Sequence, residues 1–230
     1  MTEYILGGDF SHWNVPDWPG LAAAGHKFAY IKASEGIAWT DLRYAAHNRD
    51  ATDVGLITGA YHYFRVAWPG APQAAHFHDV ATGPHVLPPA VDVEAINNAG
   101  FTQATARDRL LECLKVTEDK FGIRPMIYTS GSKGVQLIGT APWAKDYDLW
   151  VADYGIDGKG GGQGIPRLPT EWATTGFKIW QFTKTPLDQD RMLKDYYDQF
   201  VAPPADEVDV RLPRSVRDEL HDAIHRSLIT

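Results

Sequence analysis

Short apolar segments alternate with longer helical stretches along most of the chain, and this alternation limits the possible folds more than any other feature of the sequence. The short segments are rich in Val, Ile, Tyr, Phe and Trp and are too short to be typical helices. They comprise residues 4–10, 28–33, 56–64, 89–94, 125–129, 149–154 and 177–182. Strands alternating with helices favour a parallel sheet with right-handed crossovers, and seven or eight strands in about 200 residues favour a closed barrel.

The clearest helix in the sequence is expected over residues 103–121. Leu110 and Leu114 recur there at helical spacing, and Gly122 followed by Pro125 is a typical way for a helix to end. The fold class that we predict is therefore α/β, with helices connecting the strands of a barrel.

Composition and charge exclude several classes of function. The chain has 230 residues, of which 44% are hydrophobic and 22% charged, as in ordinary globular proteins. Its net charge of -7 argues against nucleic-acid binding and against attraction to an anionic membrane surface. The single cysteine, Cys113, cannot form an intramolecular disulfide and is expected to be a buried small apolar residue.

The two ends of the sequence lead to two further expectations. No apolar run is long enough to span a bilayer, and residues 1–9 lack the pattern of a secretory signal, which predicts a protein that is made in the cytoplasm and acts after release. A secreted form whose signal has been removed stays open. Residues 203–230 are interpreted as a linker plus one amphipathic helix after a barrel domain of residues 1–202. The apolar stripe of that helix comprises Val216, Leu220, Ala223, Ile224 and Leu228.

Acidic side chains stand where predicted strands end. Asp9 closes the first strand, and Asp92 and Glu94 close the fourth. Residues i and i+2 of a strand point the same way with their Cα atoms about 6.5–7 Å apart, so Asp92 and Glu94 share a face. Two neighbouring carboxylates cannot both ionise cheaply, and the raised pKa that results suits a general acid. A structural network of acids paired with basic residues is the alternative, although this strand contains no basic residue.

Seven segments in register resemble glycoside hydrolase family 25, the Chalaropsis-type lysozymes, a family that includes phage endolysins. They are Gly8–Asn14 (GDFSHWN), Tyr30–Gly36 (YIKASEG), Gly59–Tyr63 (GAYHY), Val91–Glu94 (VDVE), Ile127–Ser130 (IYTS), Leu149–Ala152 (LWVA) and Ile179–Phe182 (IWQF). The resemblance implies a modified TIM-like barrel of five strand-helix units followed by three strands. It also implies hydrolysis of the β-1,4 bond between N-acetylmuramic acid and N-acetylglucosamine in peptidoglycan.

The resemblance also implies roles for individual acids. Glu94 would be the general acid/base, and Asp92 would orient or charge-balance the acetamido group of the substrate, which itself attacks the anomeric carbon. A direct carboxylate nucleophile is the competing mechanism. Asp9 would complete the acidic cluster at the barrel mouth. Asp188 is the best fit for a fourth acid, but Asp190 is a rival because an Asp stands there where the family pattern leads us to expect Asn.

Further residues are predicted to contact the sugar. Tyr61 and Tyr128 match family positions that hydrogen-bond around the cleavage point, and Glu35 and Gln181 are weaker candidates for the same lining. Trp150 is predicted to bind substrate as well. It is one of five tryptophans that are candidates for stacking on sugar rings, each with core packing as the alternative. The five are Trp13, Trp39, Trp68, Trp150 and Trp180.

No cofactor or metal is implied by the sequence. His76, His78 and His85 lie close together but lack the spacing of a recognised zinc ligand set. The expected partner is therefore peptidoglycan, and the oligomeric state stays open. The alternatives are a chitinase-like glycan hydrolase, a non-catalytic glycan-binding barrel, and a structural barrel of a phage particle.

Overall fold

A computed structural model describes residues 2–83, 85–94, 100–155 and 165–201. A compact unit spans Met1–Phe200. The predicted linker and C-terminal helix, residues 203–230, lie outside the described residues and stay a prediction.

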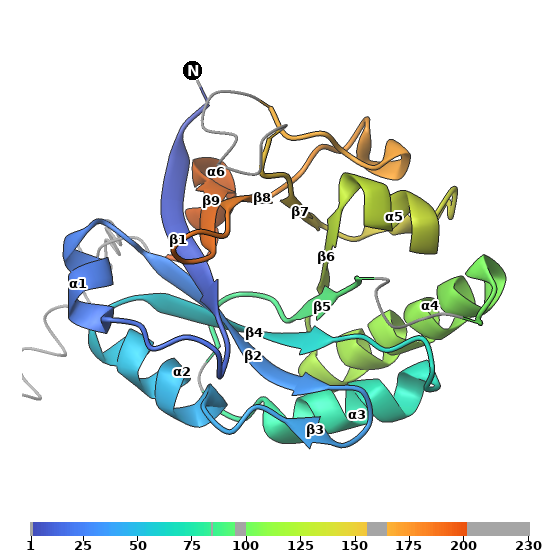
Figure 1. The fold of residues 1–230 in the computed structure, drawn as a ribbon, viewed down its shortest axis with the longest axis horizontal. Helices are drawn as coiled ribbons and strands as arrows, with labels where there is room; N and C mark the ends of the chain where they lie inside the picture. Colours follow the sequence, from blue (N-terminus) through green and yellow to red (C-terminus); the bar gives the residue numbers. More distant parts are fainter. Residues whose placement is uncertain (1, 84, 95–99, 156–164, 202–230) are drawn as a thin grey trace, which may run out of the picture. The chain divides into compact units, whose positions relative to one another are not determined.

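The unit is a closed barrel of eight strands with one additional short strand, β3, on its outside (Figure 1). Neighbouring barrel strands follow the order β1-β9-β8-β7-β6-β5-β4-β2, and β1 also pairs with β2 to close the ring. The strands are β1 Tyr4–Phe10, β2 Phe28–Glu35, β3 Trp39–Thr40, β4 Ile57–Tyr63, β5 Ala90–Asp92, β6 Met126–Ser130, β7 Leu149–Ala152, β8 Ile179–Thr183 and β9 Gln189–Leu193.

Helices follow the first five barrel strands, and the last three strands come without long helices between them. The helices are α1 Trp18–Ala23, α2 Tyr44–Asp53, α3 Gly70–Val80, α4 Gln103–Phe121, α5 Gly131–Leu137 and α6 Lys194–Tyr197, with 3₁₀ turns at Ala144–Asp146 and Thr170–Trp172. The expected architecture of five strand-helix units and three further strands is confirmed. The strand β9 is antiparallel to both of its neighbours, so the barrel is a modified one.

The bounds of α4 coincide with the helix predicted from the sequence. The Thr102 side chain accepts a hydrogen bond from the Thr105 backbone N–H at 3.1 Å, and Gly122 ends the helix in the left-handed conformation with φ of 69°. Cys113 lies buried on the core-facing side of α4, as predicted. In the described residues, no helix has the length and apolar character needed to cross a bilayer.

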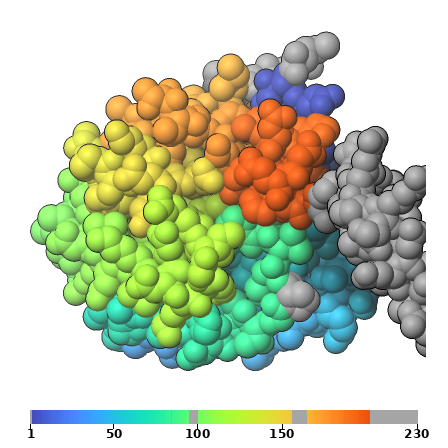
Figure 2. Space-filling model, turned by 180° about the vertical axis from the view of Figure 1, so that it is seen from behind, coloured from blue at the N-terminus to red at the C-terminus, as the bar shows by residue number. Residues whose placement is uncertain are grey.

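Apolar side chains fill the lower part of the barrel interior, at the N-terminal ends of the strands. This inner cluster includes Phe28, Tyr30, Ala90, Met126, Trp150, Ile179, Met192 and Tyr196. Two aromatic rings fit there because small residues face them: a Cβ on Gly7 would lie 2.4 Å from the Phe28 ring, and one on Gly59 would lie 2.5 Å from the Tyr30 ring. The side chain of Tyr196 in α6 packs into the same cluster, and the space-filling view shows this orange-red segment beside segments from the middle of the chain (Figure 2).

The upper part of the barrel interior is polar. Residues two apart on a strand share a face. A strand can therefore place an apolar residue in the lower part of the barrel and, two residues later, a polar residue in the upper part. The inward pairs include Tyr30 and Lys32, Ala90 and Asp92, Met126 and Tyr128, and Ile179 and Gln181. The outward residues of the strands pack against the helices in two further clusters. The architecture therefore collects polar groups at the C-terminal ends of the strands.

Candidate active site

A pocket of about 370 Å³ opens at the C-terminal ends of the barrel strands, which is where the active sites of such barrels lie. Its walls are formed by Asp9, Ser11, Trp13, Lys32, Tyr61, Tyr63, Asp92, Glu94, Tyr128, Trp150, Tyr154, Gln181, Lys184 and Asp188. All of the site residues predicted from the sequence are brought together here except Glu35.

Asp92 and Glu94 lie side by side in this pocket at the end of β5. Asp92 is 7% exposed, and its Oδ1 atom has no hydrogen-bond partner among the described residues. Burial raises the pKa of Asp92 well above its ordinary value, and the neighbouring Glu94 carboxylate raises it further. Burial also raises the pKa of Glu94, against the opposing effect of Lys133, Lys184 and Lys32. The pair therefore holds a proton more readily than free carboxylates do, which is the property a general acid needs.

The structure distinguishes the two rival acids of β9 and its preceding loop. Asp188 lines the pocket, and burial raises its pKa to about 6. Asp190 is 0% exposed and lies below the pocket floor, where its Oδ1 accepts a hydrogen bond from Trp150 Nε1 at 2.8 Å. Burial raises the pKa of Asp190 to about 7. Only Asp188 is therefore placed where a substrate can reach it.

Gln181 connects three pocket residues through its amide. Its Nε2 donates a hydrogen bond to Asp9 Oδ2 at 2.5 Å, and its Oε1 accepts hydrogen bonds from Tyr128 at 2.8 Å and from Tyr154 at 2.5 Å. Burial raises the pKa of Asp9 well above its usual range, and Asp190 and Asp188 add to the effect. Gln181 was only a weak candidate from the sequence, yet it fixes the positions of an acid and two phenols.

Tyr61 and Trp150 occupy the middle of the pocket. Burial raises the pKa of Tyr61 well above its ordinary value, as do Asp9 and Asp92, so its hydroxyl remains a hydrogen-bond donor. Trp150 is 2% exposed, and its ring packs against Tyr30 at 4.7 Å, Tyr128 at 4.8 Å and Tyr61 at 6.3 Å between centroids. Trp150 therefore forms the floor and offers no free face for stacking on a sugar. Trp180 is also buried.

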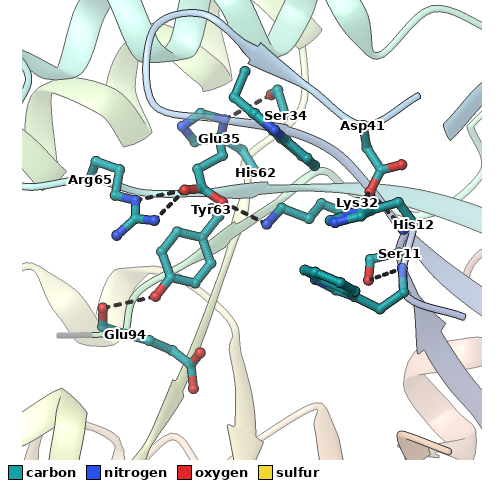
Figure 3. A network of polar contacts seen from close by, with 12 residues as sticks. Ser11, His12, Lys32, Ser34, Glu35, Asp41, His62, Tyr63, Arg65 and Glu94 are labelled. Carbon is teal, nitrogen blue, oxygen red and sulfur yellow. Dashed lines mark hydrogen bonds and ion pairs between the residues drawn. The ribbon is translucent and has the colours of Figure 1, made fainter. Parts of the chain in front are cut away.

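A network of charged residues flanks the pocket on the β2 and β4 side (Figure 3). Lys32 lines the pocket, and its Nζ donates to Glu35 Oε2 at 2.8 Å. Arg65 Nε donates to Glu35 Oε1 at 2.8 Å. Burial opposes ionisation of Glu35, but the hydrogen bonds from Lys32 and Arg65 outweigh it and lower the Glu35 pKa. The Tyr63 hydroxyl donates to the Glu94 backbone oxygen at 3.4 Å and so links this network to the acids.

Glu35 is not among the residues that line the pocket, and it contacts Lys32, which does; its role in binding the sugar stays a prediction. Simple alternation from Tyr30 and Lys32 would place Glu35 on the outer face of β2, and the register shift between Lys32 and Ser34 places it opposite Tyr63 instead. Sequence reasoning missed Lys32, although it stands two residues after inward-facing Tyr30 within the same motif. Tyr63, Tyr154 and Lys184 were also missed.

The histidines considered for metal binding have other contacts. His76 Nε2 lies 2.9 Å from the Trp39 backbone oxygen, and His85 Nε2 lies 2.6 Å from the Tyr44 hydroxyl. In the part of the chain that the structure describes, no group of three or more His, Cys, Asp or Glu residues is arranged to hold a metal ion.

Comparison with known proteins identifies the family. The family model for glycosyl hydrolases family 25 matches residues 8–190, which includes the whole pocket. The chain belongs to glycosyl hydrolases family 25. Its residues are 29% identical over 197 positions to lysozyme M1 of Streptomyces globisporus, covering 80% of this chain and 63% of that protein.

Solved structures of family-25 proteins have the same fold. The muramidase of Trichobolus zukalii superposes with a TM-score of 0.72 at 28% identity, covering 85% of this chain and 96% of that one. A bacterial lysozyme of Streptomyces coelicolor superposes with a TM-score of 0.73 at 26% identity, covering 84% of this chain and 93% of that one. The chain spans from 42 to 63% of the length of the first curated relatives that it matches.

Proposed function

We propose that this chain is an N-acetylmuramidase that hydrolyses the β-1,4 bond between N-acetylmuramic acid and N-acetylglucosamine in bacterial peptidoglycan. The observation that carries the proposal is the pair of buried Asp92 and half-buried Glu94 in the pocket at the barrel mouth, with a raised pKa for both carboxyls. Membership of family 25 and similarity to a muramidase and two lysozymes support the choice of substrate.

Glu94 is the general acid and base of the proposed reaction. Its carboxyl donates a proton to the oxygen of the leaving sugar and then takes a proton from the attacking water. Burial raises the pKa of Glu94 against the opposing effect of three lysines, which favours the protonated form that the first step needs. The Tyr63 hydroxyl, by holding the Glu94 backbone oxygen at 3.4 Å, limits movement of the residue during these steps.

Asp92 orients the acetamido group of the substrate and balances the charge that develops on it, while that group attacks the anomeric carbon. Asp92 suits this role because it lines the pocket together with Glu94, and a carboxylate accepts a hydrogen bond from an amide N–H. Direct attack by a carboxylate is the alternative reaction. A thiazoline analogue of the cyclic intermediate should inhibit the first mechanism strongly and the second weakly.

The remaining pocket residues position the sugar. Tyr61 and Tyr128 supply hydroxyl groups beside the cleavage point, and Asp9 and Asp188 bind polar groups of the sugar opposite Asp92. We propose the bacterial cell wall as the place of action, reached after release from the producing cell. Its polymeric substrate lies outside the cytoplasm.

The test of the proposed function is the Glu94→Gln variant in a cell-wall clearance assay. The amide has nearly the same shape but cannot protonate the leaving oxygen, so the rate should fall by ~10²–10⁴-fold while circular dichroism stays unchanged. Glu118→Gln is the matched control, because Glu118 lies on α4 and pairs with Arg124. Clearance by the Glu94→Gln variant at a rate near that of wild type would show that Glu94 is not the acid. Faster sugar release from chitin than from peptidoglycan would indicate a chitinase-like hydrolase instead.

A further inference from the structure

Exposed aromatic side chains continue from one side of the pocket onto the surrounding surface. Trp13 follows β1, lines the pocket and is 83% exposed, and Trp39 in β3 is 39% exposed. The His12 ring lies between them, with its centroid 4.4 Å from that of Trp13 and 5.0 Å from that of Trp39. We call these three residues, together with Tyr63, the aromatic shelf.

Lys32 joins Trp39 to Tyr63 within the shelf. Its Nζ lies 4.8 Å from the centroid of the Trp39 ring and 4.8 Å from that of the Tyr63 ring. Tyr63 and Lys32 also line the pocket, as Trp13 does. The shelf is therefore continuous with the pocket at both of its ends.

A buried carboxylate fixes the middle of the shelf from behind. Asp41 Oδ2 accepts hydrogen bonds from the His12 backbone N–H at 2.9 Å and from His12 Nδ1 at 3.0 Å, and the Asp41 side chain is 0% exposed. Asp41 Oδ1 accepts a further bond from the Arg43 backbone N–H at 2.9 Å. Figure 3 shows His12 beside Asp41, next to the Lys32 network. The shelf is thus held in place before any ligand binds, which lowers the entropy cost of binding.

The chemistry of the shelf suits a carbohydrate. Large aromatic rings exposed to water beside a polar pocket mark a binding surface, and aromatic planes match the apolar faces of sugar rings. A polymer that is cut within the pocket must leave it at both ends. Because the shelf begins where the pocket opens at Trp13 and Tyr63, the continuing chain meets these rings first.

We propose that the aromatic shelf is a glycan-binding subsite that holds sugar residues of the β-1,4-linked amino-sugar chain adjacent to those being cleaved. The inference rests on the proposed function and adds a surface from which a preference for long chains is expected. Trp13 and Trp39 provide the stacking planes, while His12 and Asp41 keep the spacing between them.

The test compares short and long soluble fragments of the peptidoglycan glycan, a tetrasaccharide and a dodecasaccharide, as substrates of the full chain. The wild type should have a lower KM for the long fragment. Trp13→Ala and Trp39→Ala should each raise the KM for the long fragment by about 3–10-fold, with a smaller effect on kcat, because one stacked ring contributes ~0.5–1.5 kcal/mol. The ratio of kcat/KM between long and short fragments should fall accordingly.

Ile123→Ala is the control, because Ile123 is 40% exposed and lies between α4 and β6, at the N-terminal ends of the strands and away from the shelf. Its long-to-short ratio should equal that of the wild type. An equal fall of the long-to-short ratio of kcat/KM in all three variants would overturn the subsite. A wild-type ratio near one would do the same. If the wild type releases no sugar from any peptidoglycan fragment, the proposed function fails, and this result is distinct from the failure of the subsite alone.

Discussion

The buried carboxyl group of Asp190 leads to a prediction about stability and pH. Asp190 lies between β1 and β8 below the pocket, with Oδ1 bonded to Trp150 and Oδ2 without a partner among the described residues. The groups that face it are other acids and phenols, namely Asp9, Asp188 and Tyr30. Burial raises its pKa from an ordinary value of 3.8 to about 7, although the hydrogen bond from Trp150 acts in the opposite direction.

The direction of the effect follows from the raised pKa. Because the folded state holds the Asp190 proton more tightly than the unfolded state, its contribution to stability is complete below about pH 4 and is lost as the pH rises through about 7. One pKa unit corresponds to 1.36 kcal/mol, so the loss is on the order of 4 kcal/mol for this shift. Asp190→Asn removes the part of the dependence that belongs to Asp190, since an amide stays neutral while its oxygen still accepts the Trp150 bond, and the raised pKa of Asp9 contributes the rest.

The assay is urea unfolding of the wild type and the Asp190→Asn variant at pH 4 and at pH 8. The two proteins should have similar free energies of unfolding at pH 4, and the variant should be more stable by roughly 2–4 kcal/mol at pH 8. Asp79→Asn, on the exposed side of α3, controls for the loss of a negative charge. A stability difference that is the same at both pH values would refute the conclusion that burial raises the pKa of Asp190.

Two further substitutions test the pocket. Asp188→Asn should lower cell-wall clearance much more than Asp190→Asn does, because only Asp188 lines the pocket, and the reverse ranking with both proteins folded by circular dichroism would assign the role to Asp190. Gln181→Leu should lower the free energy of unfolding by roughly 2–4 kcal/mol in urea titrations, because two phenols and the Asp9 carboxylate lose their partner at ~1–3 kcal/mol for each buried group. A change below ~0.5 kcal/mol would show that water replaces the amide.

The barrel was predictable from sequence because its signals are local. The period of α4 and the helix-ending Gly122 are properties of adjacent residues, and the bounds of that helix agree with the structure. By contrast, β9 has a mixed pattern of polar and apolar residues, and only the family resemblance led us to expect a strand after β8. Its antiparallel pairing with β1 depends on residues almost the whole chain apart.

The candidate site was predictable where one strand carries the pattern. Asp92 and Glu94 share a face by simple alternation, and the structure places both in the pocket. The hydrogen bonds of Gln181 were not predictable, because they join strands far apart in sequence. The position of Lys32 followed from alternation after Tyr30 and was overlooked. The position of Glu35 beside Lys32 was not predictable either, since the register shift in β2 that places it there has no evident sequence signal.

The measurement that tests the central claim most directly is the identity of the new reducing ends in digested peptidoglycan. Purified cell walls are digested, reduced with borohydride and analysed by mass spectrometry, with the Glu94→Gln protein as a blank. A muramidase produces reduced N-acetylmuramic acid at the new chain ends, and this is the predicted result. Reduced N-acetylglucosamine at those ends, or new amino termini without new reducing ends, would contradict the proposed cleavage of the muramic acid bond.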